Sequence, residues 1–199
     1  MAARRRRVLG SLVTLTYAAD PRISWRAVEA VGAAASRIAA DDPGHVREFL
    51  RRLRWLINDE SGGICWRAPE AMAEILRRRP ALYADYIPIV TSLLVSLEEE
   101  DLEHFRAGAL GAIGRLGALA RDHFGDVAPA VVSALNDPDP QTRGMAAWCL
   151  CEVGHADLLA DRPDLIADEG PVDLYEGGTI TRTTVSQLVQ RALSAEPAE

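Results

Sequence analysis

The most informative part of the sequence is residues 129–154, which read PAVVSALNDPDPQTRGMAAWCLCEVG. Apolar residues recur at helical spacing on both sides of the central Asp137-Pro-Asp-Pro140. Two Asp-Pro pairs in a row favour a tight turn followed by a new helix, because proline is tolerated in the first helical turn. The stretch therefore predicts two helices joined by a short turn, with Arg143 early in the second helix.

The same arrangement recurs along the chain. Four segments share an arginine near the start of a predicted second helix: Arg26, Arg67, Arg106 and Arg143. These arginines stand 41, 39 and 37 residues apart, and each follows an acid: Asp20, Asp59, Glu100 and Asp137. The separation is six residues in every case except Asp59, which lies eight residues before its arginine because of a Gly-Gly insertion. A helical hairpin repeated at a period near 40 residues predicts an α solenoid.

We expect the solenoid in residues 1–154 and a different C-terminal segment in residues 155–199. The expected repeats are residues 1–40, 41–79, 80–120 and 121–154. In the C-terminal segment, residues 172–181 read as a short β-hairpin with a Gly-Gly turn, and Thr184 opens a last helix with a capping-box pattern. We interpret this segment as a cap with a flexible tail that covers the apolar end of the solenoid; a hairpin that docks a partner strand is the alternative.

Residues 129–154 closely resemble a HEAT repeat, of the kind also named for phycobilisome lyases. The whole chain resembles small uncharacterised prokaryotic HEAT-repeat proteins, although the second repeat departs from the pattern at Pro69 and at the Gly-Gly insertion. The resemblance implies an all-α, right-handed superhelix and brings no known activity. It also implies a structural ladder of acids and arginines that links neighbouring repeats: Asp20, Arg26, Asp59, Arg67, Glu100, Arg106, Asp137 and Arg143.

The formal net charge of −7 conceals two oppositely charged parts of the chain. Residues 1–79 contain 15 Arg against 9 acids, whereas residues 80–199 contain 7 Arg against 20 acids. Such asymmetry can steer an acidic partner to one end of the molecule or favour head-to-tail self-association. Solvated helix faces explain the same counts without any partner.

Composition and the N-terminal segment favour a cytoplasmic protein. Residues 4–7 are arginines followed by a short apolar stretch, which resembles a signal peptide. Val8, Leu12 and Leu15 fall at helical spacing instead, which favours a helix that packs within the fold. No apolar run reaches the roughly 18 residues of a membrane-spanning helix, and the 3 cysteines cannot form a closed set of disulfides. We therefore expect neither a membrane protein nor a secreted one.

No catalytic or cofactor-binding motif is recognisable in the sequence, neither a Gly-rich phosphate loop nor a zinc-protease or serine-hydrolase motif. Cys149 and Cys151 are two residues apart in a predicted helix, so their side chains point away from each other. Cys151 and His155 share a helix face but supply only part of a zinc ligand set. We expect no enzymatic activity, no cofactor and no metal.

Glycines recur at every third position of one predicted helix: Gly108, Gly111, Gly114 and Gly117. A glycine in a helix interior costs up to about 1 kcal/mol relative to alanine, so a compensating contact is expected. We interpret the row as a surface for close packing of an adjacent helix; backbone exposed to a ligand is the alternative.

Two groups of residues are candidates for partner binding. The first lies around the Gly-Gly insertion, the least repeat-like polar segment, because tryptophan and arginine dominate the energetics of interfaces; it consists of Glu60, Trp66, Arg67 and Glu70. Arg67 paired with Asp59 in the ladder is the competing, structural interpretation.

The second group shares one face of a predicted helix over residues 45–57 and can accept phosphates or an acidic peptide: Arg47, Arg51 and Arg54. A solvated face explains part of the second group.

We predict a non-catalytic protein-interaction module, an adaptor or assembly factor that binds a protein partner on the solenoid surface. A bilin-lyase-like chromophore-binding accessory protein is the alternative that the resemblance implies. A nucleic-acid-binding solenoid is the second alternative, supported by the basic N-terminal part together with Trp25 and Trp66. The acidic C-terminal part argues against nucleic acid.

Overall fold

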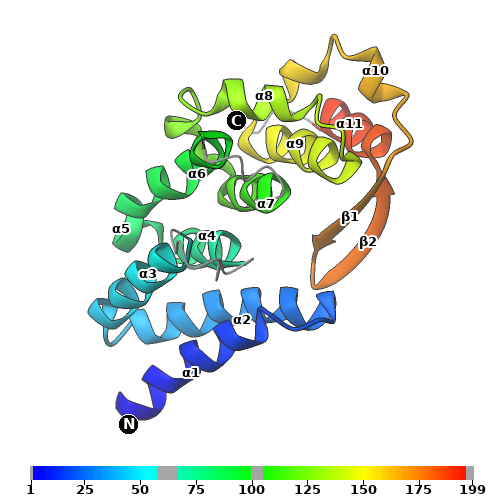
Figure 1. The fold of residues 1–199 in the computed structure, drawn as a ribbon. Coiled ribbons are helices and arrows are strands. Elements are labelled where there is room, and N and C mark those ends of the chain that lie inside the picture. Colours follow the sequence, from blue (N-terminus) through cyan, green and yellow to red (C-terminus); the bar gives the residue numbers. More distant parts are fainter. Residues whose placement is uncertain (1, 58–66, 100–104, 196–199) are drawn as a thin grey trace. The chain divides into compact units, whose positions relative to one another are not determined.

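The computed structural model describes residues 2–57, 67–99 and 105–195 and is 75% helical (Figure 1). The chain divides into two compact units, Met1–Tyr86 and Ile87–Glu199. Both units contain helical hairpins of the predicted kind, and the second unit also contains a short antiparallel sheet.

The first unit is built from two consecutive helical hairpins. Its elements are α1 (Ala2–Leu15), α2 (Pro21–Ala39), α3 (Pro43–Ile57), α4 (Ala68–Arg78), α5 (Pro80–Tyr83) and the 3-10 turn η1 (Ala84–Tyr86). Helix α1 packs against α2, and α3 packs against α4. Helix α2 also packs against α4, so the second helices of the two hairpins make the main contact between the repeats.

Asp20 and Gly32 shape the second helix of this unit. The Asp20 carboxylate caps α2 by accepting a hydrogen bond from the backbone N–H of Arg22 at 2.9 Å. Pro21 follows in the first turn, where a backbone N–H is not needed. At Gly32 the helix lies close against α4: a Cβ at this position would lie 2.9 Å from both the Cβ and the carbonyl oxygen of Glu74. The lack of a side chain at Gly32 therefore permits this close approach.

The second unit begins with two further hairpins and ends in the sheet and a last helix. Its elements are α6 (Ile87–Glu99), α7 (Arg106–Leu116), η3 (Gly117–His123), α8 (Ala128–Ala134), α9 (Pro140–Val153), η4 (Ala156–Leu159), α10 (Pro163–Ile166), β1 (Pro171–Glu176), β2 (Thr179–Thr184) and α11 (Val185–Ser194). Helix α9 lies at the centre of this unit, because it packs against α7, α8, α11 and β1.

The ends of α9 are fixed by its sequence. Asp139 caps the N-terminus by accepting hydrogen bonds from the backbone N–H groups of Gln141 and Thr142, both at 3.2 Å. Gly154 ends the helix in the left-handed conformation with φ of 90°, which glycine adopts without steric cost. These two signals confine the helix to the segment that the sequence predicted.

The glycine row of α7 is a packing surface for α9. A Cβ at Gly114 would lie 2.4 Å from Cζ3 of Trp148, and a Cβ at Gly111 would lie 3.4 Å from Cε of Met145. The absence of a side chain at Gly114 therefore makes room for the indole of Trp148. The packing interpretation is confirmed at these two glycines.

Strands β1 and β2 form a two-stranded antiparallel sheet, drawn as the orange arrows in Figure 1. The turn between them is Gly177-Gly178, with φ of 56° and 80°. Positive φ at both central residues is the requirement of a type I′ hairpin turn. Thr184 ends β2 and caps α11 by accepting a hydrogen bond from the backbone N–H of Gln187 at 3.2 Å.

The predicted all-α class with a short C-terminal β-hairpin is confirmed. Between α9 and the sheet, residues 155–166 form two short separate elements, η4 and α10. The division into a solenoid and a cap at residue 154 stays a prediction, because the structure groups α9, the sheet and α11 in one compact unit.

Among the described residues, one helical stretch is long and apolar enough, by length and composition, to cross a membrane. It is Pro80–Leu97, which spans α5, η1 and α6 and has a mean hydropathy of 1.4 over 18 residues. Within it Tyr83, Val90 and Leu94 are at most 1% exposed. A buried helix in the core of a soluble protein has the same composition, so this stretch is weak evidence for a membrane span.

Candidate functional site

In the second unit, ion pairs join successive repeats in the manner of a ladder. The guanidinium of Arg106 pairs with the Asp137 carboxylate at 2.9 Å, and the two side chains are only 14% and 8% exposed. Arg143 pairs with Asp168 at 2.7 Å and donates further hydrogen bonds to the carbonyl oxygens of Asp137 and Pro138, at 2.7 and 3.0 Å. Each arginine thus binds the carboxylate of a residue that follows it in the chain, by 31 and 25 residues.

Asp168 is the residue of this ladder that sequence reasoning missed. It lies after α10, in the segment that we interpreted as a cap, where no repeat pattern marks it. The hydrogen bond from Arg143 lowers the pKa of the Asp168 carboxyl below its usual value of 3.8. The ladder of the second unit therefore continues past the last recognisable repeat.

In the first unit, the residues expected in the ladder have other contacts. Asp20 caps α2 and pairs with Arg22 at 3.4 Å, while Arg26 is exposed. The position that matches Arg143, four residues after the capping aspartate, is occupied by Ser24. Arg26 therefore stands two residues farther from the capping aspartate of its helix than Arg143 does. Asp59 and Glu100 lie outside the described residues.

Arg67, from the first candidate group, is held by aromatic and acidic neighbours. Its guanidinium lies 3.9 Å from the centroid of the Trp25 ring, donates to Glu70 Oε1 at 2.9 Å and donates to Ser24 Oγ at 3.3 Å. Glu70 is fully buried. Arg67 and Glu70 therefore connect α4 with α2, and Glu60 and Trp66 of the same candidate group lie outside the described residues.

The three arginines of the second candidate group lie on α3, where Arg47 is half-buried and Arg51 and Arg54 are exposed. Arg47 pairs with Asp85, donates to the Leu82 carbonyl oxygen at 2.7 Å and lies 5.6 Å from the centroids of two tyrosine rings. The hydrogen bond to Asp85 raises the pKa of Arg47 and lowers the pKa of Asp85. Arg51 pairs with Glu48 and, like Arg54, is exposed. Only the outer part of this group is therefore free to meet a partner.

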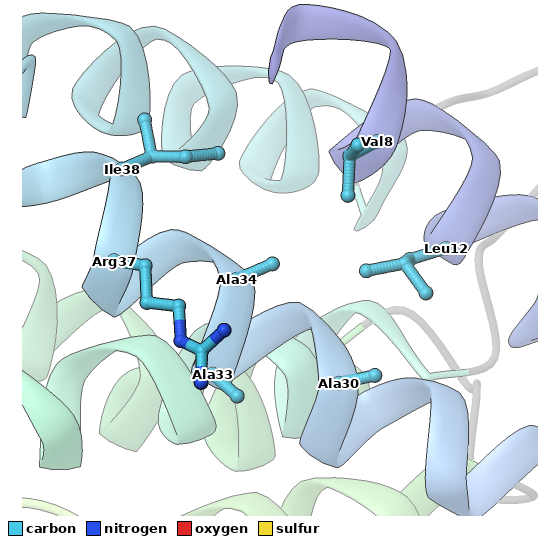
Figure 2. A pocket seen from close by; sticks show the side chains of 7 residues that line it. All are labelled: Val8, Leu12, Ala30, Ala33, Ala34, Arg37 and Ile38. Atoms are coloured by element: carbon cyan, nitrogen blue, oxygen red, sulfur yellow. The ribbon is translucent and has the colours of Figure 1, made fainter. Parts of the chain in front are cut away.

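An open, largely apolar groove lies between α1 and α2 in the described part of the first unit, with a volume of about 620 Å³ (Figure 2). It is lined by Val8, Leu12, Ala30, Ala33, Ala34, Arg37 and Ile38. Figure 2 shows Val8 and Leu12 on α1 facing the small side chains of α2. Among the lining residues whose side chains the structure describes, Arg37 is the only charged one.

Alanines on α2 create this groove. Ala35 is fully buried and Ile38 is 7% exposed, whereas Ala33 is exposed and Ala34 is half-buried. On α1, Val8 is 42% exposed although it lies one residue from the fully buried Leu9. The hairpin is thus closed on its inner side and open on its outer side.

Sequence reasoning missed the groove, although part of its signal was visible. The spacing of Val8 and Leu12 predicted an apolar helix face, but alanine is compatible with both core and surface. Which alanines of α2 stay uncovered depends on the tertiary contact between α2 and α4, which one sequence does not reveal.

The cysteines of the described residues have no exposed reactive thiolate. Burial raises the pKa of the Cys149 thiol far above its usual value, and burial also raises the pKa of the half-buried Cys151. Among the described residues, no group of three or more His, Cys, Asp or Glu side chains is arranged to hold a metal ion. The open groove between α1 and α2 is our candidate recognition surface in the described part of the first unit.

Comparison with known proteins agrees with the repeat architecture. A family model described as HEAT-like repeat matches residues 103–150. An uncharacterised protein of Archaeoglobus fulgidus is 30% identical to this chain over 183 residues, which cover 89% of this chain and 91% of that protein. No solved structure matches the chain.

Proposed function

This chain belongs to the HEAT-like repeat proteins, in one family with the archaeal relative, and we propose that it binds a partner protein through the groove between α1 and α2. HEAT-like repeats generally mediate protein interactions. The observation that carries the proposal is the open apolar lining of the groove. The occupant that we propose is an amphipathic helix of another protein, with an acidic residue beside its apolar stripe.

The dimensions of the groove suit a helix. The lining residues of α2 run from Ala30 to Ile38, a length of about 13 Å at roughly 1.5 Å per residue. A helix with its side chains is about 10 Å across. The alanines in the floor allow close approach, and apolar anchors at positions i, i+3, i+4 and i+7 of the partner helix can fill the groove.

The repeat architecture also supports a helical occupant. Helix α2 contacts α4 on its inner side, which is the contact between the two repeats of the first unit. In a repeat stack each unit buries its apolar faces against neighbours on both sides. A helix supplied by another protein would cover the outer face of α2 in the way that a neighbouring repeat covers an inner face.

The positive charge near the groove indicates which kind of partner helix would bind there. Arg37 is the charged residue among the described side chains of the groove, and it is exposed. Residues 1–79 contain 15 Arg against 9 acids, so the field around this unit favours the approach of an acidic partner. A carboxylate on the partner helix next to its apolar stripe would pair with Arg37.

Photo-crosslinking tests the proposal directly. A photoreactive amino acid replaces Ala33 in the groove or, as the matched control, the exposed Ala81 of α5, and the crosslinked partner peptide is identified by mass spectrometry. We expect a product from position 33 that maps to an amphipathic, acidic helical segment. Equal crosslinking at positions 33 and 81, or a product without such a segment, would contradict the proposal.

A further inference from the structure

The two outer edges of the small sheet differ in the hydrogen bonds that their backbone groups make with described side chains. On the outer edge of β1, the side-chain amide of Gln141 binds both backbone groups of Asp173: it accepts from the N–H at 2.8 Å and donates to the carbonyl oxygen at 3.1 Å. The Tyr175 carbonyl oxygen accepts from Arg115 at 3.1 Å. Side chains of α9 and α7 thus close this edge as a neighbouring strand would.

No described side chain closes the outer edge of β2 in this way. In the antiparallel register, Glu176 pairs with Thr179 across the turn, and alternate residues direct their backbone groups toward the partner strand. Asp173 and Tyr175 point outward on β1, so their partners Arg182 and Ile180 point outward on β2. Among the described residues, no hydrogen bond to the outward backbone groups of Ile180 or Arg182 is present.

The composition of β2 favours pairing. The strand reads Thr-Ile-Thr-Arg-Thr-Thr, which is rich in β-branched residues and contains neither the proline nor the lysine that commonly blocks an exposed edge. The strand is also held in place before any partner arrives. The Gly177-Gly178 turn sets its register, and Val172 of β1 packs against Gly144 of α9, where a Cβ would lie 2.4 Å from the valine.

We propose that the outer edge of β2 binds an extended, acidic segment of another protein as a third strand, through the backbone groups of Ile180 and Arg182. Because this edge is preorganised, less conformational entropy is lost on binding. Arg182 is exposed and makes no ion pair among the described residues, so an Asp or Glu opposite it supplies charge complementarity. This surface is built from other residues than the groove and does not depend on the proposed function.

A second copy of the chain is a poorer occupant. The same alternation also directs Thr184 outward, so antiparallel pairing of β2 with itself uses Ile180, Arg182 and Thr184 together only when Arg182 lies opposite Arg182 of the other copy. Like charges directly opposite each other destabilise a strand pair. A single pair of six-residue strands is also a small contact compared with the interface of a stable dimer.

Selection from a random heptapeptide library displayed on phage, with the full chain immobilised, tests this proposal. We expect enriched peptides that alternate β-branched residues around an Asp or Glu. Ile180→Pro removes an outward N–H but no hydrogen bond to β1, so it should lower the affinity for an enriched peptide about tenfold or more. Arg182→Glu should lower it likewise, whereas Thr181→Ala, which leaves the edge intact, should retain wild-type affinity.

Amide hydrogen exchange of the wild-type chain gives a second readout that needs no variant to fold. With a saturating enriched peptide, exchange should slow at the amides of Ile180 and Arg182 and stay unchanged at Thr181, whose N–H already faces β1. The proposal is overturned if no peptide is enriched, or if the enriched peptides leave these two amides unprotected. Protection that rises with the concentration of the chain alone would assign the edge to a second copy and overturn it as well.

Discussion

Asp137 is the residue through which two repeats of the second unit are joined. Its carboxylate binds Arg106 and its carbonyl oxygen binds Arg143. Asp137→Asn keeps the size of the side chain but removes its charge, and hydrogen bonds to charged groups contribute roughly 1.5–3 kcal/mol. We expect the free energy of unfolding in urea to fall by about 2 kcal/mol.

The same substitution at Asp20 is the control for this experiment. Asp20 is a solvated helix cap beside the exposed Arg22, and asparagine caps helices as well as aspartate does. We expect Asp20→Asn to leave the urea midpoint unchanged. Equal losses for Asp20→Asn and Asp137→Asn would show that the Arg106–Asp137 pair adds no stability of its own.

The Arg143–Asp168 pair predicts a pH dependence on the acid side. Since the hydrogen bond from Arg143 lowers the pKa of Asp168 in the folded state, the folded chain binds fewer protons than the unfolded chain near the usual value of 3.8. The pair therefore stabilises the fold above that pH, and its contribution is lost as the pH falls through the lowered pKa. Urea midpoints between pH 6 and 3 should fall less steeply for Asp168→Asn than for the wild type, and parallel curves would contradict the assignment.

Gly114 provides a test of packing. Gly114→Ala places a methyl group 2.4 Å from the Trp148 ring, which forces α7 and α9 apart and should lower the unfolding free energy by about 1–3 kcal/mol. In Gly10→Ala the new methyl group meets nothing within 4 Å, and α1 should gain up to about 1 kcal/mol in helix propensity. Thermal unfolding of both variants measures this difference, and a gain in stability at position 114 would disprove the close contact.

At the level of secondary-structure elements, Gln141 connects β1 to α9. Gln141→Ala removes two hydrogen bonds to Asp173, so the unfolding free energy should fall by about 1–2 kcal/mol and the Asp173 amide should exchange faster. Gln141→Glu retains the acceptor for this N–H and should slow its exchange relative to Gln141→Ala. Unchanged exchange at Asp173 in both variants would show that the edge of β1 is held by other contacts.

The elements could be predicted from the sequence wherever local signals agree. Asp139, Pro140 and Gly154 mark both ends of α9, and Gly177-Gly178 marks the hairpin. The partners of the ladder arginines could not be predicted in this way, because they depend on how one repeat packs against the next. Arg26 resembles Arg67 in its neighbours along the chain but sits farther from the start of its helix, so it lies exposed.

For the whole molecule, repetition predicted the class of fold but not the site. The four in-phase arginines indicated stacked helical hairpins, and the match to a HEAT-like repeat agrees with them. The groove depends on which alanines of α2 remain uncovered after α4 has packed, a tertiary outcome without a local signal. Glu60 and Trp66 lie outside the described residues, so their part in binding stays a prediction.

The central claim is that the groove between α1 and α2 binds a partner helix, and an affinity measurement tests it most directly. A synthetic peptide of the segment crosslinked at position 33 is titrated against the wild type, Ala34→Glu in the groove and Ala81→Glu outside it. The new carboxylate at position 34 fills the groove next to Arg37, so binding should weaken at least about tenfold, as for the loss of a central interface residue. Ala81→Glu should bind like the wild type. Equal affinities for all three proteins would contradict the account.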